Sequence, residues 1–397
     1  MPSCAGSAKL RSLARGGVLV FVAACANAAS GGEPWHWTKE NPLPTPTARF
    51  AQSMSFDSLR NVTVLFGGQA NVQVGIGAVN AETWELSGTT WTQRLVSGPS
   101  ARGSQRSAYD SSRGKTVLFG GANLSTTFAD TWEWDGTSWE QRIVAGPSAR
   151  GAQAMAYDSK RNVVVLFGGS TLQAETYRGD TWEWNGDSWS LRSETGPSPR
   201  TLSTMAFDED RGVCVLFGGL AGGPALADTW EWDGISWTQR LVSGPQPRMM
   251  SSMIYDEQQH AVMLVGGRLS GGNDYSDTWA WDGVEWTEIQ ATGAVKTAYH
   301  GLSRDRSRHV TLRFGNQGSE FTPSTWLLTS PPCPADLNDD RVVDDADFSI
   351  FVGAYNLLVC DDPSMPVGCP ADLNGDALVN DADFQIFVVA YDQLVCD

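Results

Sequence analysis

Two acidic segments near the C-terminus repeat one spacing of oxygen-bearing side chains. Oxygen ligands at alternate positions of a twelve-residue loop can surround one hard cation such as calcium, with a backbone carbonyl at position 7. Two loops 36 residues apart fit this pattern: Asp336, Asn338, Asp340, Val342 (carbonyl), Asp344 and Asp347, then Asp372, Asn374, Asp376, Leu378 (carbonyl), Asn380 and Asp383. A solvated acidic turn does not explain two copies in register, so the sequence predicts two calcium sites.

Each acidic loop is followed by apolar residues at helical spacing. The two sets are Phe348, Phe351, Val352 and Tyr355, then Phe384, Phe387, Val388 and Tyr391. This spacing predicts two amphipathic helices. A loop followed by a helix, present twice, resembles the type I dockerins over residues 335–395. The loops depart from an EF-hand because Asp replaces Glu at position 12, and Arg341 and Ala377 occupy the glycine position.

The dockerin resemblance implies a partner surface and a disulfide pattern. In that family, loop positions 10 and 11 help to choose a cohesin partner, and here they are Asp345, Ala346, Asp381 and Ala382. The family's antiparallel helices imply the disulfides Cys333–Cys396 and Cys360–Cys369. We therefore expect residues 333–397 to form a small α-helical calcium module, joined through the linker 331–332, that attaches to a cohesin-like protein or a cell surface.

The rest of the chain is dominated by a repeat. The segment Val-Leu-Phe-Gly-Gly ends at Gly68, Gly121, Gly169 and Gly219, and weaker copies extend the series to six, 48 to 53 residues apart. One unit reads as four strands, with bounds 150–157, 163–167, 181–184 and 189–192. Four antiparallel strands per repeat predict an all-β, six-bladed propeller. The segment around Trp37 matches the outer strand that the last repeat lacks, so we expect it to complete the last blade.

The double glycine followed by spaced aromatic residues resembles the kelch family over residues 35–330. Trp134 stands where kelch repeats usually have tyrosine, the hairpin before the last tryptophan is short, and Asn316 replaces a glycine in the sixth repeat. The tryptophans recur in every blade, which predicts core positions and argues against a sugar-stacking surface. The loops between the second and third strands vary in length and sequence, so we expect ligands at that end of the blades.

A set of cations begins each inner strand at the same end of the blades. Its members are Arg49, Arg102, Arg150, Arg200, Arg248 and Lys296. Six cations around a channel mouth would bind an anionic glycan such as a uronate or sialate. The alternative is structural: aspartates such as Asp130 and Asp180 begin the third strands at the same end and would pair with the arginines.

The sequence offers little catalytic chemistry. It has four histidines, with no His/Cys cluster of zinc spacing. The leading hypothesis is a non-catalytic recognition scaffold that binds a glycan or protein. The rival is a carbohydrate-active enzyme, such as a sugar epimerase, lyase or hydrolase. An Arg, Glu and His300 cluster at the channel mouth would favour the enzyme, and a fully paired arginine ring would favour the scaffold.

The N-terminus and the charge distribution indicate an exported protein. Residues 1–28 combine basic residues, a short apolar run and a small-residue cleavage site, which predicts a signal peptide. Val22–Cys25 also resembles a bacterial lipobox, so a lipid on Cys25 is the alternative. The net charge is −17, and residues 333–397 hold 14 Asp and one Arg, or −13 of it. This acidity argues against nucleic-acid partners, and the sequence predicts no transmembrane segment and assigns no role to Cys214.

Overall fold

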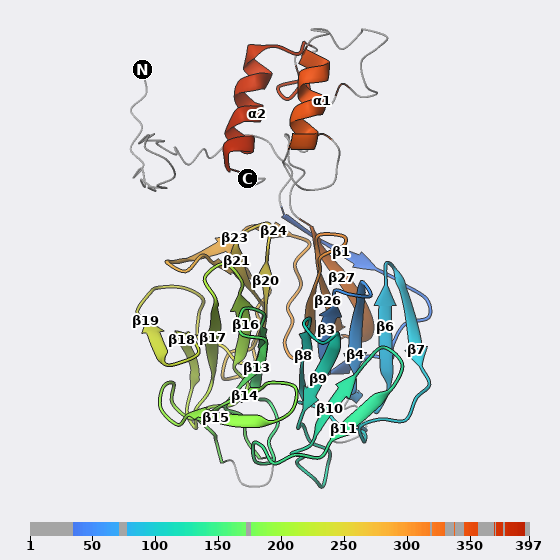
Figure 1. The fold of residues 1–397 in the computed structure, drawn as a ribbon, viewed down its shortest axis with the longest axis vertical. Helices are drawn as coiled ribbons and strands as arrows, with labels where there is room; N and C mark the ends of the chain where they lie inside the picture. Colours follow the sequence, from blue (N-terminus) through green and yellow to red (C-terminus); the bar gives the residue numbers. More distant parts are fainter. Residues whose placement is uncertain are drawn as a thin grey trace. The chain divides into compact units, whose positions relative to one another are not determined.

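The computed structural model describes a ring of β-sheets and, treated separately, a pair of C-terminal helices (Figure 1). It describes residues 35–70, 78–171, 176–317, 320–329, 337, 345–355, 369, 371–375 and 378–393. The predicted signal peptide 1–28, with Cys25, and the linker 331–332 lie outside these residues. Five four-stranded sheets and one five-stranded sheet make six blades, numbered here in chain order. The predicted all-β, six-bladed propeller is confirmed.

Blade 3 shows how one repeat folds. Its strands are β12 (Ala154–Asp158), β13 (Val163–Phe167), β14 (Thr181–Trp184) and β15 (Trp189–Ser193), hydrogen-bonded in that order and antiparallel. We call the end of the blades with the 168–180 connection the loop face, and the end with the 159–162 turn the turn face. The inner strand begins four residues later than predicted because Ala152 has a φ of 54°, which interrupts the extended backbone.

Blades 1, 2, 4 and 5 repeat this arrangement. Blade 1 contains β3 (Ser53–Asp57), β4 (Val62–Phe66), β6 (Thr83–Ser87) and β7 (Thr90–Arg94), and blade 2 contains β8 (Arg106–Asp110), β9 (Lys115–Phe119), β10 (Thr131–Trp134) and β11 (Trp139–Arg142). Blade 4 contains β16 (Thr204–Asp208), β17 (Val213–Leu220), β18 (Ala225–Trp232) and β19 (Trp237–Arg240), and blade 5 contains β20 (Ser252–Asp256), β21 (Ala261–Val265), β22 (Thr278–Trp281) and β23 (Trp286–Ile289). A short pair, β2 (Arg49–Phe50) and β5 (Gln69–Ala70), lies on the loop face of blade 1.

Blade 6 combines strands from both ends of the propeller. It contains β25 (Gly301–Asp305), β26 (Val310–Gln317) and β27 (Glu320–Thr329), and β1 (Trp35–Glu40) pairs antiparallel with β27. The two-residue strand β24 (Ala291–Thr292) pairs with the outer edge of β1. The prediction that the segment around Trp37 completes the last blade is therefore confirmed, and Trp37 is buried.

A closed ring of backbone hydrogen bonds links the inner strands of all six blades. One residue in each blade, just before the inner strand, donates its N–H to the carbonyl of the equivalent residue in the preceding blade, at 2.7–2.9 Å. In chain order the six are Ala51, Ser104, Ala152, Leu202, Met250 and Tyr299, and each has a φ between 54° and 61°. We call this ring the collar. It fixes the width of the propeller's central channel at the loop face.

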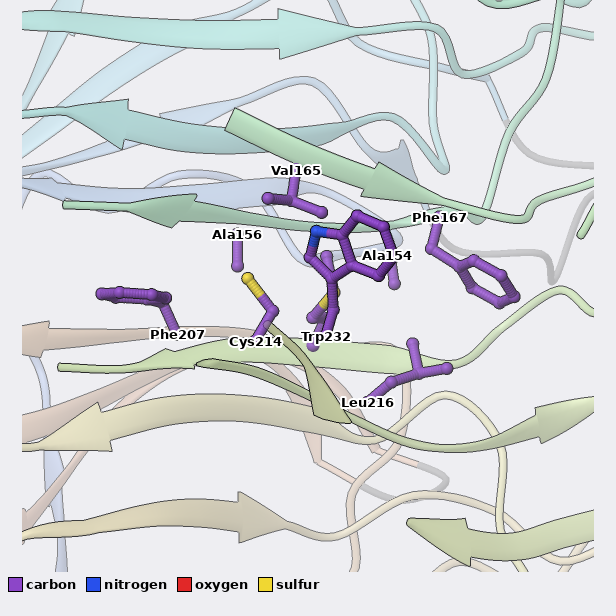
Figure 2. Packing of buried hydrophobic residues seen from close by; sticks show 9 residues of the cluster. Ala154, Ala156, Val165, Phe167, Phe207, Cys214, Leu216 and Trp232 are labelled. Carbon is purple, nitrogen blue, oxygen red and sulfur yellow. The ribbon is translucent and has the colours of Figure 1, made fainter. Parts of the chain in front are cut away.

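The hydrophobic core is a series of layers between neighbouring blades. Figure 2 shows the layer between blades 3 and 4, where Phe167 and Val165 from β13 pack against Leu216, Cys214 and Trp232 from blade 4. Cys214 is fully buried there and unpaired, and burial raises the pKa of its thiol. Its role is that of a small apolar core residue. The tryptophans of the repeats lie in these layers, as predicted.

The C-terminal helices form a small core of their own. Helices α1 (Asp345–Tyr355) and α2 (Asp381–Gln393) follow the two predicted acidic loops, as expected from the sequence. Phe351 and Phe387 are fully buried and their rings stack with centroids 4.7 Å apart. Among the described residues, neither helix has the length and apolar character needed to cross a membrane.

Candidate functional site

The channel between the inner strands contains two cavities separated by a belt of side chains. The larger cavity, about 270 Å³, lies toward the turn face and is called the wide chamber. The smaller, about 90 Å³, lies between the belt and the collar and is called the narrow chamber. The residues that line both chambers form the belt, one from each blade: Met54, Ser107, Met155, Met205, Met253 and Leu302. The middle of the channel is therefore lined mainly by apolar side chains.

The wide chamber is lined mainly by aromatic and small side chains. The fourth residue of each inner strand contributes an aromatic ring in five blades, and Arg304 replaces it in blade 6. Arg304 is already paired with Asp256 at 2.9 Å, and Arg306 is paired with Glu209. The charged side chains Arg304 and Arg306 of this chamber are therefore neutralised by neighbours.

The narrow chamber is polar and asymmetric. Hydroxyl groups from Ser53, Thr204, Ser251 and Ser252 line it. Two further side chains differ from their counterparts in the other blades: Arg106 lies where the repeat has small residues, and His300 lies where blades 1 to 3 have glutamine. The described lining includes no carboxylate. The Arg, Glu and His300 cluster that would have favoured an enzyme is therefore incomplete in the channel.

The glutamines that correspond to His300 join neighbouring blades. Gln52, Gln105 and Gln153 each donate from Nε2 to a backbone carbonyl of the preceding blade, at 2.8–2.9 Å. His300 does not make the equivalent bond. It is 5% exposed, and neither ring nitrogen has a hydrogen-bond partner within the described residues.

The repeated arginines of the loop face are structural ties between blades. Arg150 donates to both carboxylate oxygens of Asp180 at 2.6 and 2.9 Å and to the carbonyl of Gly168, all within blade 3. Its own backbone N–H and carbonyl bond to Phe128 and Gly121 of blade 2. Each such arginine therefore connects two blades.

The same contacts recur around the ring. The pairs are Arg49–Glu82, Arg102–Asp130, Arg150–Asp180, Arg200–Asp228 and Arg248–Asp277. Every one of the five arginine side chains is at most 1% exposed. Their guanidinium groups are directed at carboxylates and carbonyls of the blade and not into the channel cavities. This geometry corresponds to the structural alternative raised for the predicted anion-binding ring.

In blade 6, the sixth predicted member of that ring, Lys296, is not equivalent to the five arginines. Gly267 donates its N–H to the carbonyl of Thr297, as the glycines of earlier blades do to their arginines, so Thr297 and not Lys296 has the equivalent position. Lys296 is exposed. The partner position also changes, because Ser324 replaces the aspartate. Arginine and aspartate are thus lost together, as expected if each requires the other.

The ion pairs lower the pKa of the aspartates. Burial alone would raise the pKa of Asp130, Asp180 and Asp228, but the hydrogen bonds and positive charge of the paired arginines outweigh it. The result is a pKa below the ordinary aspartate value for each. These carboxylates are ionised at neutral pH and remain so under mildly acidic conditions.

A second set of ties lies toward the turn face, and the sequence analysis missed it. Glu183 in β14 accepts hydrogen bonds from Arg161 at 2.5 Å and from the indole N–H of Trp232 in blade 4 at 3.1 Å. Equivalent bonds link Glu85 to Trp134, Glu133 to Trp184, and Glu231 to Trp281. The signal was available in the sequence, since Glu and Trp recur side by side in the third strand, as in Glu183-Trp184.

The second acidic loop is partly described. Asp383, fully buried, accepts N–H groups of Leu373 and Asn374 at Oδ1 and of Asn380 at Oδ2, at 2.8–3.1 Å. Asp372 accepts the N–H of Gly375 at 2.8 Å. The loop is therefore folded back on its position-12 carboxylate, and its available donors are oxygens, the type that calcium prefers. Among the residues that the structure describes, no group of three acidic, histidine or cysteine residues is close enough to bind a metal.

The first acidic loop shows one matching contact. Asp347 is fully buried and accepts the N–H of Leu337 at 2.7 Å, the counterpart of the Leu373–Asp383 bond. The remaining predicted ligands, Asp336, Asn338, Asp340, Val342, Asp344 and Asp376, lie outside the described residues, as do Cys333, Cys360 and Cys396. The disulfide pairing that includes Cys369 stays a prediction.

The predicted partner-binding positions lie at the starts of the two helices. Ala346 and Ala382 are exposed in the first turns of α1 and α2. Asp381 is also exposed and accepts a hydrogen bond from the Tyr355 hydroxyl. Asp345 is the first residue of α1.

Comparison with known proteins identifies the repeat. Residues 133–315, from β10 of blade 2 to β26 of blade 6, match the family profile of the KLHDC2/KLHL20/DRC7 kelch-repeats domain. No curated protein matches the chain. A kelch propeller points to a role in protein interaction or as a scaffold. The part of the propeller from blade 2 to blade 6 therefore matches a kelch-repeat domain.

Proposed function

We propose that this protein is an exported, non-catalytic recognition scaffold. Its propeller binds a protein or a glycan, and its C-terminal module binds two calcium ions and attaches it to a cohesin-like partner or a cell surface. The observation that carries the proposal is the full pairing of the five loop-face arginines within the blades. These groups stabilise a rigid ring, and rigid rings with variable loops serve recognition.

The loop face is the proposed recognition surface. The second-to-third strand connections differ between blades, and one of them, 268–276, contains the Arg268–Asp274 pair at 2.5 Å. The test uses the full mature chain with polygalacturonate, alginate and sialylated glycans. We expect saturable binding to one class without new reducing ends, and weaker binding after the 268–276 loop is replaced by the blade 4 connection 220–227. Cleavage of any of these glycans would contradict the scaffold and favour the enzyme.

The calcium proposal is supported by the two matching loop closures on Asp347 and Asp383. Asp383 accepts three backbone N–H groups and Asp347 accepts one, so each buried carboxylate helps to organise its loop, and a cation would offset the negative charge. Calorimetric titration of the mature chain should give two calcium sites. Asp383→Asn keeps the side-chain size and should leave one site. Absence of binding to the unaltered chain would contradict the proposal.

Attachment and export complete the proposal. Exposed Ala346 and Ala382 leave the starts of both helices accessible to a partner, and binding to a cohesin should be lost when a chelator removes calcium. Mass spectrometry of the secreted protein should show an N-terminus just after residue 28. A lipid-bearing N-terminus at Cys25 would instead support the lipobox alternative, and retention of residues 1–28 would contradict export by this signal.

A further inference from the structure

We infer that the narrow chamber of the propeller is a binding site for a small carboxylate, with Arg106 as its charge partner and His300 as its hydrogen-bond donor. The inference goes beyond the scaffold proposal and does not depend on it. It begins from two side chains that break the repeat and face the same cavity.

Arg106 is an unpaired cation. The equivalent residues in the other blades are Ser53, Ala154, Thr204, Ser252 and Gly301. The blade fold therefore does not require a guanidinium here. Burial lowers the pKa of Arg106, and no ion pair or hydrogen bond of its side chain occurs among the described residues. Arg106 is half-buried, so its desolvation is partial, and an anionic ligand in the chamber would supply the missing counter-ion.

His300 provides the second observation. A 5% exposed imidazole with two unbonded nitrogens lines the same chamber. Burial, together with the positive charges of Arg313 and Arg106, lowers the pKa of His300 well below its usual range. The ring is thus neutral near pH 7 and has one N–H to donate, which matches a carboxylate oxygen.

Arg313, the other cation near His300, is occupied elsewhere. It is 3% exposed, and its guanidinium carbon lies 5.0 Å from the Trp37 ring centroid and 5.1 Å from that of Trp326. It does not line the narrow chamber. The chamber therefore presents one free positive charge to a ligand.

One positive charge, one N–H donor and several hydroxyls select the ligand class. A monoanion balances Arg106, whereas a dianion would leave a net negative charge in a buried space. The volume of about 90 Å³ admits a group no larger than a short carboxylic acid. A carboxylate can accept from the guanidinium and the imidazole at once and from hydroxyls at its remaining lone pairs.

The test is a titration of the full mature chain with acetate, followed by NMR of the imidazole groups. The chain has four histidines, and His300→Gln, which restores the residue of blades 1 to 3, assigns the signal. We expect a saturable shift of the His300 signal. Arg106→Ser, which restores the residue of blades 1 and 5, should weaken acetate binding by about tenfold or more. Lys296→Ala is the matched control and should leave the titration unchanged.

Two arms decide the ligand class and the outcome. Sodium chloride and sodium sulfate at equal ionic strength should shift the His300 signal less than acetate does. The inference is overturned if acetate leaves the signal in place, if Arg106→Ser responds as the unaltered chain does, or if chloride acts as well as acetate. The Arg106→Ser protein should keep the thermal unfolding midpoint of the unaltered chain, which separates loss of binding from loss of fold.

Discussion

The four interfaces that join blades 1, 2, 3, 4 and 5 in succession differ from the two interfaces that flank blade 6. The first four each contain a Glu–Trp bond, as between Glu183 and Trp232. On either side of blade 6 both partners are replaced: Ala280 faces Leu328, and Leu327 faces Leu86 at the equivalent positions. Those interfaces depend on apolar contact, for example of Leu86 and Leu327 with Phe314. At both interfaces the glutamate and the tryptophan are absent together, which suggests that the two groups act as one unit.

Blade 6 also lacks the loop-face tie, and it gains polar groups elsewhere. Thr297 and Ser324 replace arginine and aspartate, whereas His300 and Arg313 replace residues that are glutamine and leucine in blade 3. Burial lowers the pKa of Arg313 to about 9. The blade that lacks the repeated ties therefore carries His300 into the narrow chamber and buries Arg313 beside Trp37 and Trp326. This difference separates the positions used for stability from those available for function.

A substitution in β1, the strand that closes the ring, tests this comparison most directly. Trp37 in β1 is equivalent to Trp189 in β15, and both are at most 7% exposed. We expect Trp37→Ala and Trp189→Ala each to lower the free energy of unfolding by about 3–5 kcal/mol, because each leaves a cavity between blades. Urea unfolding measures both. A much smaller effect of Trp37→Ala would mean that β1 does not complete blade 6 in solution.

Acid provides a test of the loop-face ties. The pKa of Asp180 in the folded state lies below 3.8, and the unfolded value is about 3.9. The pair's contribution is therefore complete above about pH 4 and is lost as the pH falls through the folded-state pKa. Asp180→Asn should reduce the free energy of unfolding by about 1.5–3 kcal/mol at pH 7, and the difference should shrink below pH 4.

Asp187→Asn is the control for this acid test. Its side chain is 91% exposed, so the substitution should have little effect at either pH. A difference between Asp180→Asn and the unaltered chain that stays constant from pH 7 to pH 3 would contradict an ionised Asp180.

A double-mutant cycle sharpens the account of the turn-face ties. Glu183→Leu and Trp232→Leu together copy the Leu327 and Leu86 arrangement beside blade 6. We expect the double variant to be more stable than the sum of the single effects predicts, by about 0.5–3 kcal/mol. Additive effects would show that glutamate and tryptophan act independently and that their joint loss around blade 6 has no energetic cause.

The repeat made the fold predictable from the sequence. Two of the four strands of blade 3, 163–167 and 181–184, have the predicted bounds, because apolar runs and turn residues mark both ends. The start of the inner strand was misplaced because Ala152 is left-handed in the collar. Alanine gives no sign of that conformation in a sequence. Only the closed ring of backbone bonds explains it.

The candidate site was less predictable. The arginine ring was predicted as a site because the arginines recur in each repeat. In a propeller, however, residues also recur because every blade needs the same stabilising contacts. Arg106 and His300 repeat nowhere, and their common cavity depends on blades 2 and 6 lying on either side of blade 1. Lys296 was wrongly predicted as the sixth member of the ring because its positive charge matches that of the arginines in the other blades. The backbone hydrogen bond from Gly267 shows that Thr297 has the equivalent position.

The central claim is that loop-face arginines stabilise the propeller while Arg106 remains available to a ligand. The same substitution at two sites tests it most directly: Arg150→Ser and Arg106→Ser, compared by urea unfolding at pH 7. Arg150→Ser leaves Asp180 without its partner and should cost about 3 kcal/mol. Arg106→Ser should change the free energy of unfolding by less than about 0.5 kcal/mol or increase it. Equal losses at the two sites would contradict the account.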